Sequence, residues 1–467
     1  MNRAQKTASP VAELSSGPTQ FDWPLAFPAE TYLRQRIDEF LARNPFARAL
    51  ADRMRIETGT DFFEWTDHLT LPASEQKALM DLGFEADDVE TPNGEVALHH
   101  PRATLPRVLL VKGNRPMLAL RPEFVADFLS AHSLPGPIEG DAGSRFRRAL
   151  VNEQNGTRLE AVERSAYRGY VTAKLPDADL KKIVQARELW RTRRRHCATD
   201  EEGVKESSRV LDASLKLVGR DLSCQYFFED ERRYWESRNR AARVQKLRQD
   251  SLGLGWGNHD HHTFRCSRRH FVDLIELLLQ LGFSKRERYY AGSEAGWGAQ
   301  ISEQPVVGIT VFADVDLLPE ETEVDFSKIR LGPAPRLGTV GLWCGLHGES
   351  FLEAGMHHLE ARFDFDLLRA QLQKEGVTTM KPFSDFEFLR QAFTEGERWA
   401  VPRERAKRLL QEGLVTTEQF DKFLKEGALG SHLENLQRHG GFKGFNQKSV
   451  SVIISATDPR KNLAHAA

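Results

Sequence analysis

Hydrophobic and polar positions follow their most regular pattern between residues 256 and 317. Residues 260–265 fit a strand, because alternate side chains of a strand point to opposite faces. His261, Thr263 and Arg265 would then share one face. At ~3.3 Å per residue, the imidazole and the guanidinium would lie about 13 Å apart along the strand. That spacing leaves room for a metal ion at one end of a small acidic substrate and a carboxylate clamp at the other.

After this strand the pattern changes to that of a helix and then back. Residues 270–281 carry apolar side chains at three- and four-residue steps, and Gly282 is placed to end the predicted helix. Two extended segments and the apolar run 306–312 follow. This order predicts a β-α-β-β-β module. Residues 356–363 begin the same pattern a second time, and both copies contain a histidine followed four residues later by an arginine, which indicates an internal repeat.

The motifs in these two segments, in their order, resemble those of one enzyme family. Asp-His-x-x-Phe-Arg at 260–265 is followed by Leu-Gly-Phe at 281–283 and by a tyrosine and a tryptophan eight residues apart at 289 and 297. His-Leu-Glu-Ala-Arg at 358–362 and Phe-Leu-Arg-Gln-Ala-Phe at 388–393 come next. The series resembles the 2-oxoadipate dioxygenase/decarboxylase (hydroxyglutarate synthase) family of the vicinal-oxygen-chelate superfamily. The resemblance covers about a third of the chain.

This resemblance implies both a fold and a reaction. The fold is α+β, with paired β-α-β-β-β modules forming a curved sheet, and one Fe(II) is bound by two histidines and a glutamate. We therefore expect an Fe(II)-dependent dioxygenase that decarboxylates a small, 2-oxoadipate-like acid with O2 to a 2-hydroxy acid. Two histidines and one carboxylate leave positions open for such a substrate and O2. The alternatives are another metal-dependent enzyme of this fold (a lyase, an isomerase or an extradiol-type oxygenase) and a carboxylate-binding module without catalysis.

The resemblance assigns His261 and His358 as metal ligands. His262 and His357 are their competitors, because a slip of one residue in strand register exchanges the two faces. Arg265 is the expected catalytic residue, as the clamp for a substrate carboxylate, since its planar fork matches a carboxylate bidentately.

The third ligand and a second arginine are less well defined by the sequence. The resemblance places a glutamate on the last strand of the second module, and Glu395 is the expected ligand. It follows the second histidine by only 37 residues, which is short for a whole module, so Glu397, Glu349 and Glu303 remain alternatives. For Arg362 we expect an ion pair, with Glu360 or Asp364 as the two possible partners, rather than a second substrate clamp.

Composition shifts along the chain suggest its domain boundaries. Residues 1–20 are rich in small and polar residues, which predicts a flexible tail. Residues 21–250 are expected to be mostly helical, apart from a hairpin within 105–120. The first module would occupy 251–335, and the second module, with a helical insertion, 336–467.

Charge and cysteine content narrow the range of partners and compartments. The net charge of −2 gives no electrostatic case for nucleic acid or a membrane surface. The basic run 187–196 is followed at once by acidic residues, so we expect a solvated helix face there. The four cysteines lack Cys-x-x-Cys spacing, which fits a reducing cytoplasm. No apolar stretch reaches ~20 residues, so we expect no membrane span, and the N-terminus has no apolar segment of the kind that directs secretion. The expected partners, a small carboxylic acid and O2, are those that the resemblance implies.

Overall fold

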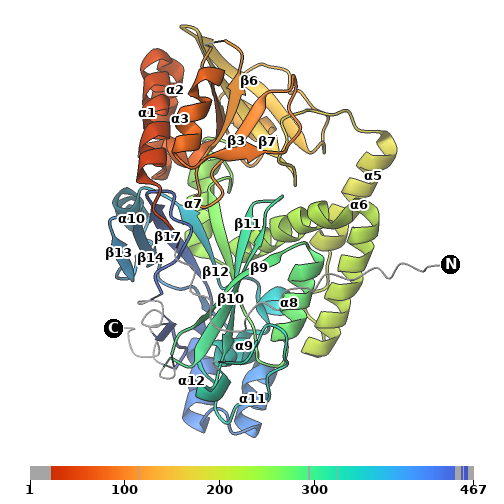
Figure 1. Ribbon diagram of the computed structural model, residues 1–467. Helices are drawn as coiled ribbons and strands as arrows, with labels where there is room; N and C mark the ends of the chain where they lie inside the picture. Colours follow the sequence, from red (N-terminus) through yellow and green to blue (C-terminus); the bar gives the residue numbers. More distant parts are fainter. Residues whose placement is uncertain are drawn as a thin grey trace, which may run out of the picture.

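The structure is a computed structural model that describes residues 23–113, 115–292, 295–321, 323–447, 454–455 and 457–460. Two large sheets, of seven and eight strands, organise an N-terminal and a C-terminal domain (Figure 1). The expected tail at 1–20 lies outside the described residues.

The eight-stranded sheet of the C-terminal domain is built from two modules of the same design. The first consists of β8 (His259–Arg265), α8 (Phe271–Gln280), β9 (Ser284–Tyr290), β10 (Trp297–Gln304) and β11 (Ile309–Asp316). The second consists of β12 (His358–Arg362), α10 (Phe365–Lys374), β13 (Ser384–Phe386), β14 (Leu389–Phe393) and β17 (His432–Arg438). The strand order is β13-β14-β17-β12-β8-β11-β10-β9. This confirms the α+β fold with paired vicinal-oxygen-chelate modules forming a curved sheet.

The two modules meet through their first strands. β8 and β12 run antiparallel at the centre of the sheet, and each lies parallel to the last strand of its own module. The module helices end at Gly282 and Gly376, both with positive φ, which a glycine adopts without the Cβ penalty. Because each module places its first strand beside its last strand, residues near the centre of the sheet come from both modules.

A helical insertion separates the last two strands of the second module. It contains β15 (Arg398–Trp399), α11 (Arg403–Gln411), α12 (Thr417–Glu426) and β16 (Ala428–Leu429), and the two short strands pair with each other. Thr416 and Gln419 form a capping box at the start of α12. Before the second module lies α9 (Thr339–His347). The insertion moves the last strand of the module to residue 432 and beyond.

The N-terminal domain differs from the expectation of a mostly helical region, because a mixed sheet lies between its helices. The strand order is β2-β3-β4-β1-β5-β7-β6. The strands are β1 (Thr66–Pro72), β2 (Glu85–Asp87), β3 (Val96–His99), β4 (Arg107–Val111), β5 (Met117–Leu120), β6 (Phe146–Gln154) and β7 (Thr157–Arg164). The helices are α1 (Phe27–Arg43), α2 (Pro45–Arg53), α3 (Gln76–Asp81) and α4 (Val125–Ala131). Short 3-10 or π segments lie at Met54–Thr58, Phe62–Trp65, Ala73–Glu75, Pro319–Glu321 and Ser350–Ala354.

The hairpin expected within residues 105–120 is wrong. Both strands exist, but they do not pair with each other, since β1 lies between them. β4 pairs with β1 in parallel and β5 pairs with it antiparallel. The partner strand comes from a segment about 40 residues earlier, which local turn signals do not reveal.

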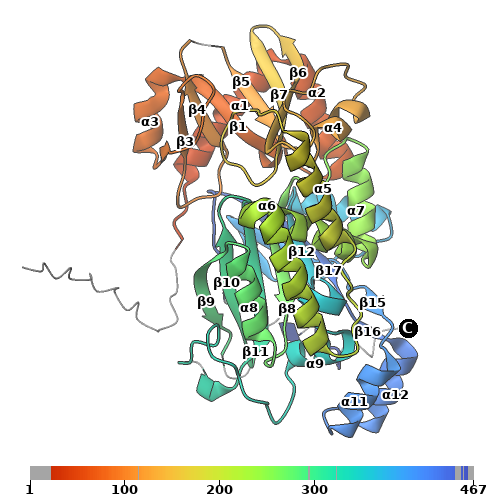
Figure 2. The same cartoon turned by 90° about the vertical axis from the view of Figure 1, so that its right-hand side faces the viewer.

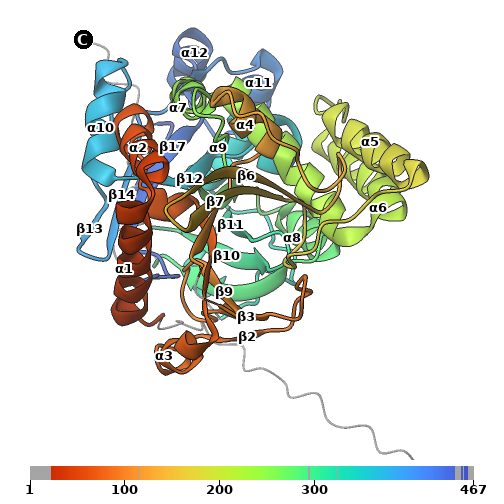
Figure 3. The same cartoon turned by 90° about the horizontal axis from the view of Figure 1, so that it is seen from above.

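Three helices connect the domains: α5 (Asp177–Arg191), α6 (Asp200–Ser237) and α7 (Arg240–Asp250). α6 packs against α8 of the first module, whereas α7 contacts α10 and β17 of the second. Figure 2 shows α5 and α6 alongside α8. Phe227 and Phe228 of α6 contact Phe264 of β8. In Figure 3, seen from above, the N-terminal sheet lies over the end of the C-terminal sheet. The aromatic side chains of α6 therefore form a packing surface for the first module.

The basic run 187–196 is not a fully solvated helix face. Arg193 and Arg195 both pair with Glu231, and the side chains of Arg193 and Glu231 are buried. The acidic partners lie on α6, about 35 residues further along the chain. Among the described helices, none combines the length and apolar character that crossing a bilayer requires.

Candidate metal centre

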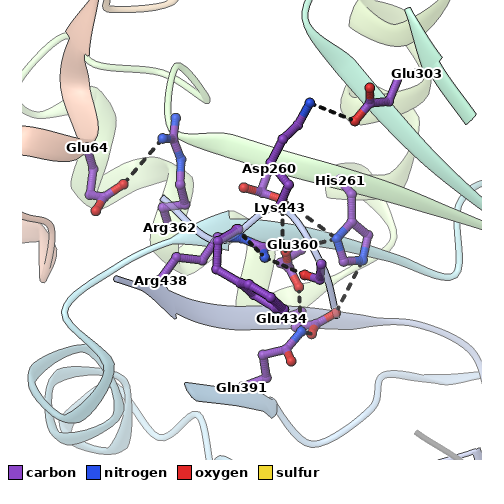
Figure 4. Close-up of polar contacts among 12 residues, drawn as sticks. Glu64, Asp260, His261, Glu303, Glu360, Arg362, Gln391, Glu434, Arg438 and Lys443 are labelled. Carbon is purple, nitrogen blue, oxygen red and sulfur yellow. Dashed lines mark hydrogen bonds and ion pairs between the residues drawn. The ribbon is translucent and has the colours of Figure 1, made fainter. Parts of the chain in front are cut away.

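Three side chains from three adjacent strands converge on the same point. His261 of β8, His358 of β12 and Glu434 of β17 are buried and place one ligand atom each within 4.8 Å of one another. His358 Nε2 lies 3.0 Å from Glu434 Oε2, and His261 Nε2 lies 3.8 Å from the same oxygen. Figure 4 shows His261 and Glu434 facing each other. Two imidazoles and a carboxylate are a metal-binding combination of donors.

Strand pairing explains why these residues meet. In the antiparallel β8–β12 pair, His358 lies opposite Thr263, which shares a face with His261. In the parallel β12–β17 pair, Glu360 lies opposite Glu434. Because residues two apart on a strand point to the same face, all five side chains lie on one face of the sheet. The centre is thus built from the junction of the two modules.

A second layer of polar contacts orients the His261 imidazole. Its Nδ1 lies 2.8 Å from Glu360 Oε1, on the edge of the ring away from Nε2. The Gln391 amide donates to Glu360 Oε2 at 2.9 Å and to Glu434 Oε1 at 3.0 Å, and Arg438 donates to Glu360 Oε1 at 3.1 Å. A carboxylate against the second nitrogen is the usual way in which proteins orient a metal-binding histidine.

The second histidine is held by its neighbour in sequence. His358 Nδ1 and His357 Nδ1 lie 2.9 Å apart in a hydrogen bond. This contact engages Nδ1 of His358 and leaves its Nε2 facing Glu434. Both candidate histidines therefore present Nε2 to the same carboxylate.

The electrostatics of the cluster fit a cation at this point. Burial by itself would lower the pKa of His261, but Glu360, Asp260 and Glu434 outweigh burial and raise it to about 10. Burial and the neighbouring Glu360 carboxylate raise the pKa of Glu434 well above its ordinary value. Two carboxylates in a buried site repel each other unless a positive charge lies beside them. The raised pKa means that a proton on His261 supplies that charge, and a divalent ion bound by His261, His358 and Glu434 would replace this proton, so the donor set fits a metal.

The structure brings together two of the three residues expected from the sequence. His261 and His358 lie in the cluster, while His262 points to the other face and packs against Phe228 of α6. Glu395 is exposed and takes no part in the cluster. Glu434 occupies the place that Glu395 was expected to fill.

The other carboxylates considered are engaged elsewhere. Glu397 accepts a hydrogen bond from the backbone of Arg240, Glu349 accepts one from the backbone of Ser267, and Glu303 pairs with an arginine and a lysine. One signal in the sequence does mark the correct strand. The tripeptide His-Leu-Glu occurs at 358–360 and again at 432–434, and the two copies lie in register on adjacent strands.

Arg265 is buried at the far end of β8. One of its nitrogens, Nη2, donates to Thr457 at 2.9 Å, and its guanidinium lies 5.9 Å from the centre of the Trp343 ring. Within the described residues, its Nε and Nη1 have no hydrogen-bond partner. Burial lowers the pKa of Arg265 to about 10, although Asp314 and other acidic groups act against it. Buried donors without partners are costly, and a ligand carboxylate would satisfy both.

Arg362 forms an ion pair, as expected, but its partner is neither Glu360 nor Asp364. It lies 3.4 Å from Glu64 of the N-terminal domain. Glu360 instead faces His261 and Arg438.

Two cavities adjoin the cluster. The metal pocket, of about 60 Å³, is lined by the three clustered side chains together with aromatic residues that include Trp297, Phe312 and Phe393. The interdomain cavity, of about 480 Å³, lies between the two domains. His261 and Phe312 line both cavities. The candidate centre is therefore adjacent to a larger cavity formed jointly by the two domains.

No family model matches the chain, and no curated protein matches it in sequence. Among solved structures, a putative hydrolase from Shewanella frigidimarina is 14% identical over 45% of this chain and 91% of its own, with a TM-score of 0.31. A mutant 4-hydroxymandelate synthase from Streptomyces coelicolor is 13% identical over 85% of this chain and 98% of its own, with a TM-score of 0.29. A methylmalonyl-CoA epimerase from Mycobacterium tuberculosis is 13% identical over 39% of this chain and 88% of its own, with a TM-score of 0.22. These similarities are too low to assign a function to this chain.

Proposed function

We propose that this protein is a metal-dependent enzyme that binds Fe(II) through His261, His358 and Glu434. Its substrate would be a small 2-oxo carboxylic acid resembling 2-oxoadipate, which it would convert with O2 into a 2-hydroxy acid and CO2. The observation that carries the proposal is the buried convergence of two imidazole nitrogens on one carboxylate. The resemblance in motif order supports the choice of reaction.

The internal repeat supports a three-residue ligand set with an open side. When β8 and β12 are aligned at their histidines, the counterpart of Glu434 in the first module is Phe312. Its ring lies 4.4 Å from the ring of His261. One module thus supplies a carboxylate and the other an apolar side chain that cannot bind the ion. Two histidines and one carboxylate with free positions suit Fe(II) in oxygenases, where the metal supplies a Lewis acid for the 2-oxo acid and electrons for O2.

The side chains around the cluster have separate tasks in this proposal. Glu360 and Gln391 hold the His261 ring and the Glu434 carboxylate in place. Arg265 would hold the distal carboxylate of a diacid with the two donors that have no partner in the described residues. The aromatic lining of the metal pocket would keep bulk water away from the reacting carbon.

The reaction is tested by oxygen uptake and CO2 release with Fe(II)-loaded protein and a series of 2-oxo diacids. We expect stoichiometric O2 use and CO2 release with a six-carbon diacid, and much slower turnover with a 2-oxo acid that lacks the second carboxylate. Metal binding without O2 use would favour a lyase or isomerase on the same site. Absence of both metal binding and turnover would favour a carboxylate-binding module and contradict the proposal.

A further inference from the structure

The interdomain cavity has a concentration of positive charge that the chain as a whole does not have. Its lining contains eight arginines and lysines but only four aspartates and glutamates, whereas the whole chain has a net charge of −2. Both domains contribute these cations. Figure 4 shows Arg362 facing Glu64, Arg438 beside Asp260 and Lys443 facing Glu303. A cavity of one charge sign with low-dielectric walls concentrates ions of the opposite sign.

Most of these cations already have carboxylate partners, and one does not. Arg164 forms a two-pronged pair with Asp67, and Arg438 pairs with Asp260. For Arg121, which follows β5, the described residues provide neither an ion pair nor a side-chain hydrogen bond. Its surroundings are also unfavourable for a cation. Burial lowers the pKa of Arg121 to about 10, and Arg164 and other nearby arginines lower it further against the opposing effect of Asp67.

Arg362, on the other side of the cavity, is only partly compensated. Its Nη1 lies 3.4 Å from Glu64, while its Nε is buried without a hydrogen-bond partner in the described part of the chain. Arg362 is one of the groups whose charge lowers the pKa of Arg121, so the two guanidiniums lie in each other's field. Two arginines from different domains thus line one cavity, one of them without a carboxylate partner in the described residues and the other with a buried donor to spare.

We propose that the interdomain cavity is a second ligand site, which binds a carboxylate or phosphate group through Arg121 and Arg362 of its lining. Guanidinium groups bind both anions bidentately, and a bound anion would relieve the repulsion between the two arginines. The site is distinct from Arg265, which lies four residues beyond His261 on β8 at the opposite end of the metal cluster. It needs no metal, so it goes beyond the proposed reaction and stands independently of it.

The anion could come from two sources. It could be a free ion, such as phosphate, or an acidic group of the substrate itself, because His261 lines both the interdomain cavity and the metal pocket. Inhibition distinguishes them. Phosphate that competes with the 2-oxo acid would identify the substrate as the natural occupant, while phosphate that binds without competing would identify a separate anion.

The site is tested by calorimetric titration of the full-length, chelator-treated protein with inorganic phosphate and, separately, with adipate. We expect saturable binding of at least one probe, weakened tenfold or more by Arg121→Gln and by Arg362→Gln. Arg121→Lys keeps the charge but loses the fork, so its affinity should fall between wild type and Arg121→Gln. Binding that persists unchanged in Arg121→Gln, or no saturable binding of either probe, would overturn the site.

A matched control separates this site from the general charge of the cavity. Arg168 lines the same cavity but is paired with Asp87. Arg168→Gln removes one positive charge from the same lining, and we expect affinity within about twofold of wild type. If Arg168→Gln weakened anion binding as much as Arg121→Gln, the anion would be attracted by the general charge of the cavity, and the proposal would be overturned. Melting temperatures of all variants show whether each remains folded.

Discussion

Glu360 contacts the His261 ring on the edge away from Glu434, and Gln391 connects the two carboxylates. At the scale of single residues, the groups that orient the ligands therefore matter as much to the site as the ligands themselves. Arg265 is the complementary case: it is fully buried, yet two of its donors have no partner in the described residues. Substitutions of Glu360 and Arg265 can therefore distinguish a side chain that positions a ligand from one that only stabilises the fold.

Glu360→Gln is predicted to weaken Fe(II) binding by about 10- to 100-fold, because a neutral amide orients and polarises the His261 ring less well than a carboxylate. Competition with a coloured chelator measures the affinity. Asp366→Asn is the control, since this carboxylate pairs with Arg390 on the exposed surface of α10. Equal affinity in Glu360→Gln and wild type would show that Glu360 does not support the site.

Arg265→Met is predicted to leave the melting temperature unchanged or higher while abolishing turnover of 2-oxo diacids with full metal content. A buried arginine with unpaired donors contributes little to stability, and an apolar side chain of similar length removes its desolvation penalty. Thermal unfolding, metal analysis and O2 uptake on one preparation test this. A large fall in melting temperature would instead assign Arg265 a structural role.

At the scale of elements, the insertion between β14 and β17 supports the second module without entering the site. Its helices lie in a separate apolar cluster with α9. The insertion is also the reason that the third ligand was missed. Local periodicity and motif order predicted both modules and both histidines, because each lies within a few residues of its own signal. Glu434 follows an insertion of more than 30 residues, whereas motif order predicts the glutamate soon after the strand at 388–393, at Glu395.

The N-terminal sheet escaped prediction for a related physical reason. The central strand β1 is buried along nearly its whole length, yet Asp67, His68 and Thr70 interrupt the continuous apolar run that marks a strand buried on both faces. Its neighbours in the sheet are β4 and β5, and α3, β2 and β3 lie between β1 and these strands in the sequence. Pairings of this kind depend on contacts distant in sequence, whereas turn signals describe only adjacent residues.

Thr416→Ala is predicted to lower the free energy of unfolding by about 1 kcal/mol, because it removes the capping box of α12. Metal affinity should not change, since the insertion lies outside the cluster. Urea denaturation and metal titration of the same variant provide the two measurements. A loss of metal affinity would show that the insertion controls the position of β17.

At the scale of the whole molecule, the two domains form the interdomain cavity together, and buried ion pairs stabilise the N-terminal wall of that cavity. Asp67 and Arg164 are both almost completely buried, and their two-pronged pair joins β1 to β7. Burial tends to raise the pKa of Asp67, but Arg164, Arg107 and His68 hold it well below its ordinary value. A carboxyl whose pKa is lowered by folding stabilises the folded state above its unfolded pKa and loses that effect as the pH falls.

Asp67→Asn is accordingly predicted to destabilise the protein by about 3–5 kcal/mol at pH 7, because it leaves Arg164 buried without its partner. The difference from wild type should shrink as the pH falls below about 4, the ordinary pKa of aspartate. Denaturant unfolding between pH 3 and pH 7 tests both parts. A difference that does not change with pH would contradict the ion-pair explanation.

The most direct test of the central claim is the metal content of anaerobically purified, iron-reconstituted protein. Wild type, His261→Ala, His358→Ala, Glu434→Ala and Glu395→Ala would be compared by elemental analysis, with circular dichroism to establish that each is folded. We predict near-stoichiometric iron in wild type and in Glu395→Ala, and loss of most iron in the other three variants. Iron retained in Glu434→Ala but lost in Glu395→Ala, or no iron bound by folded wild type, would contradict the site.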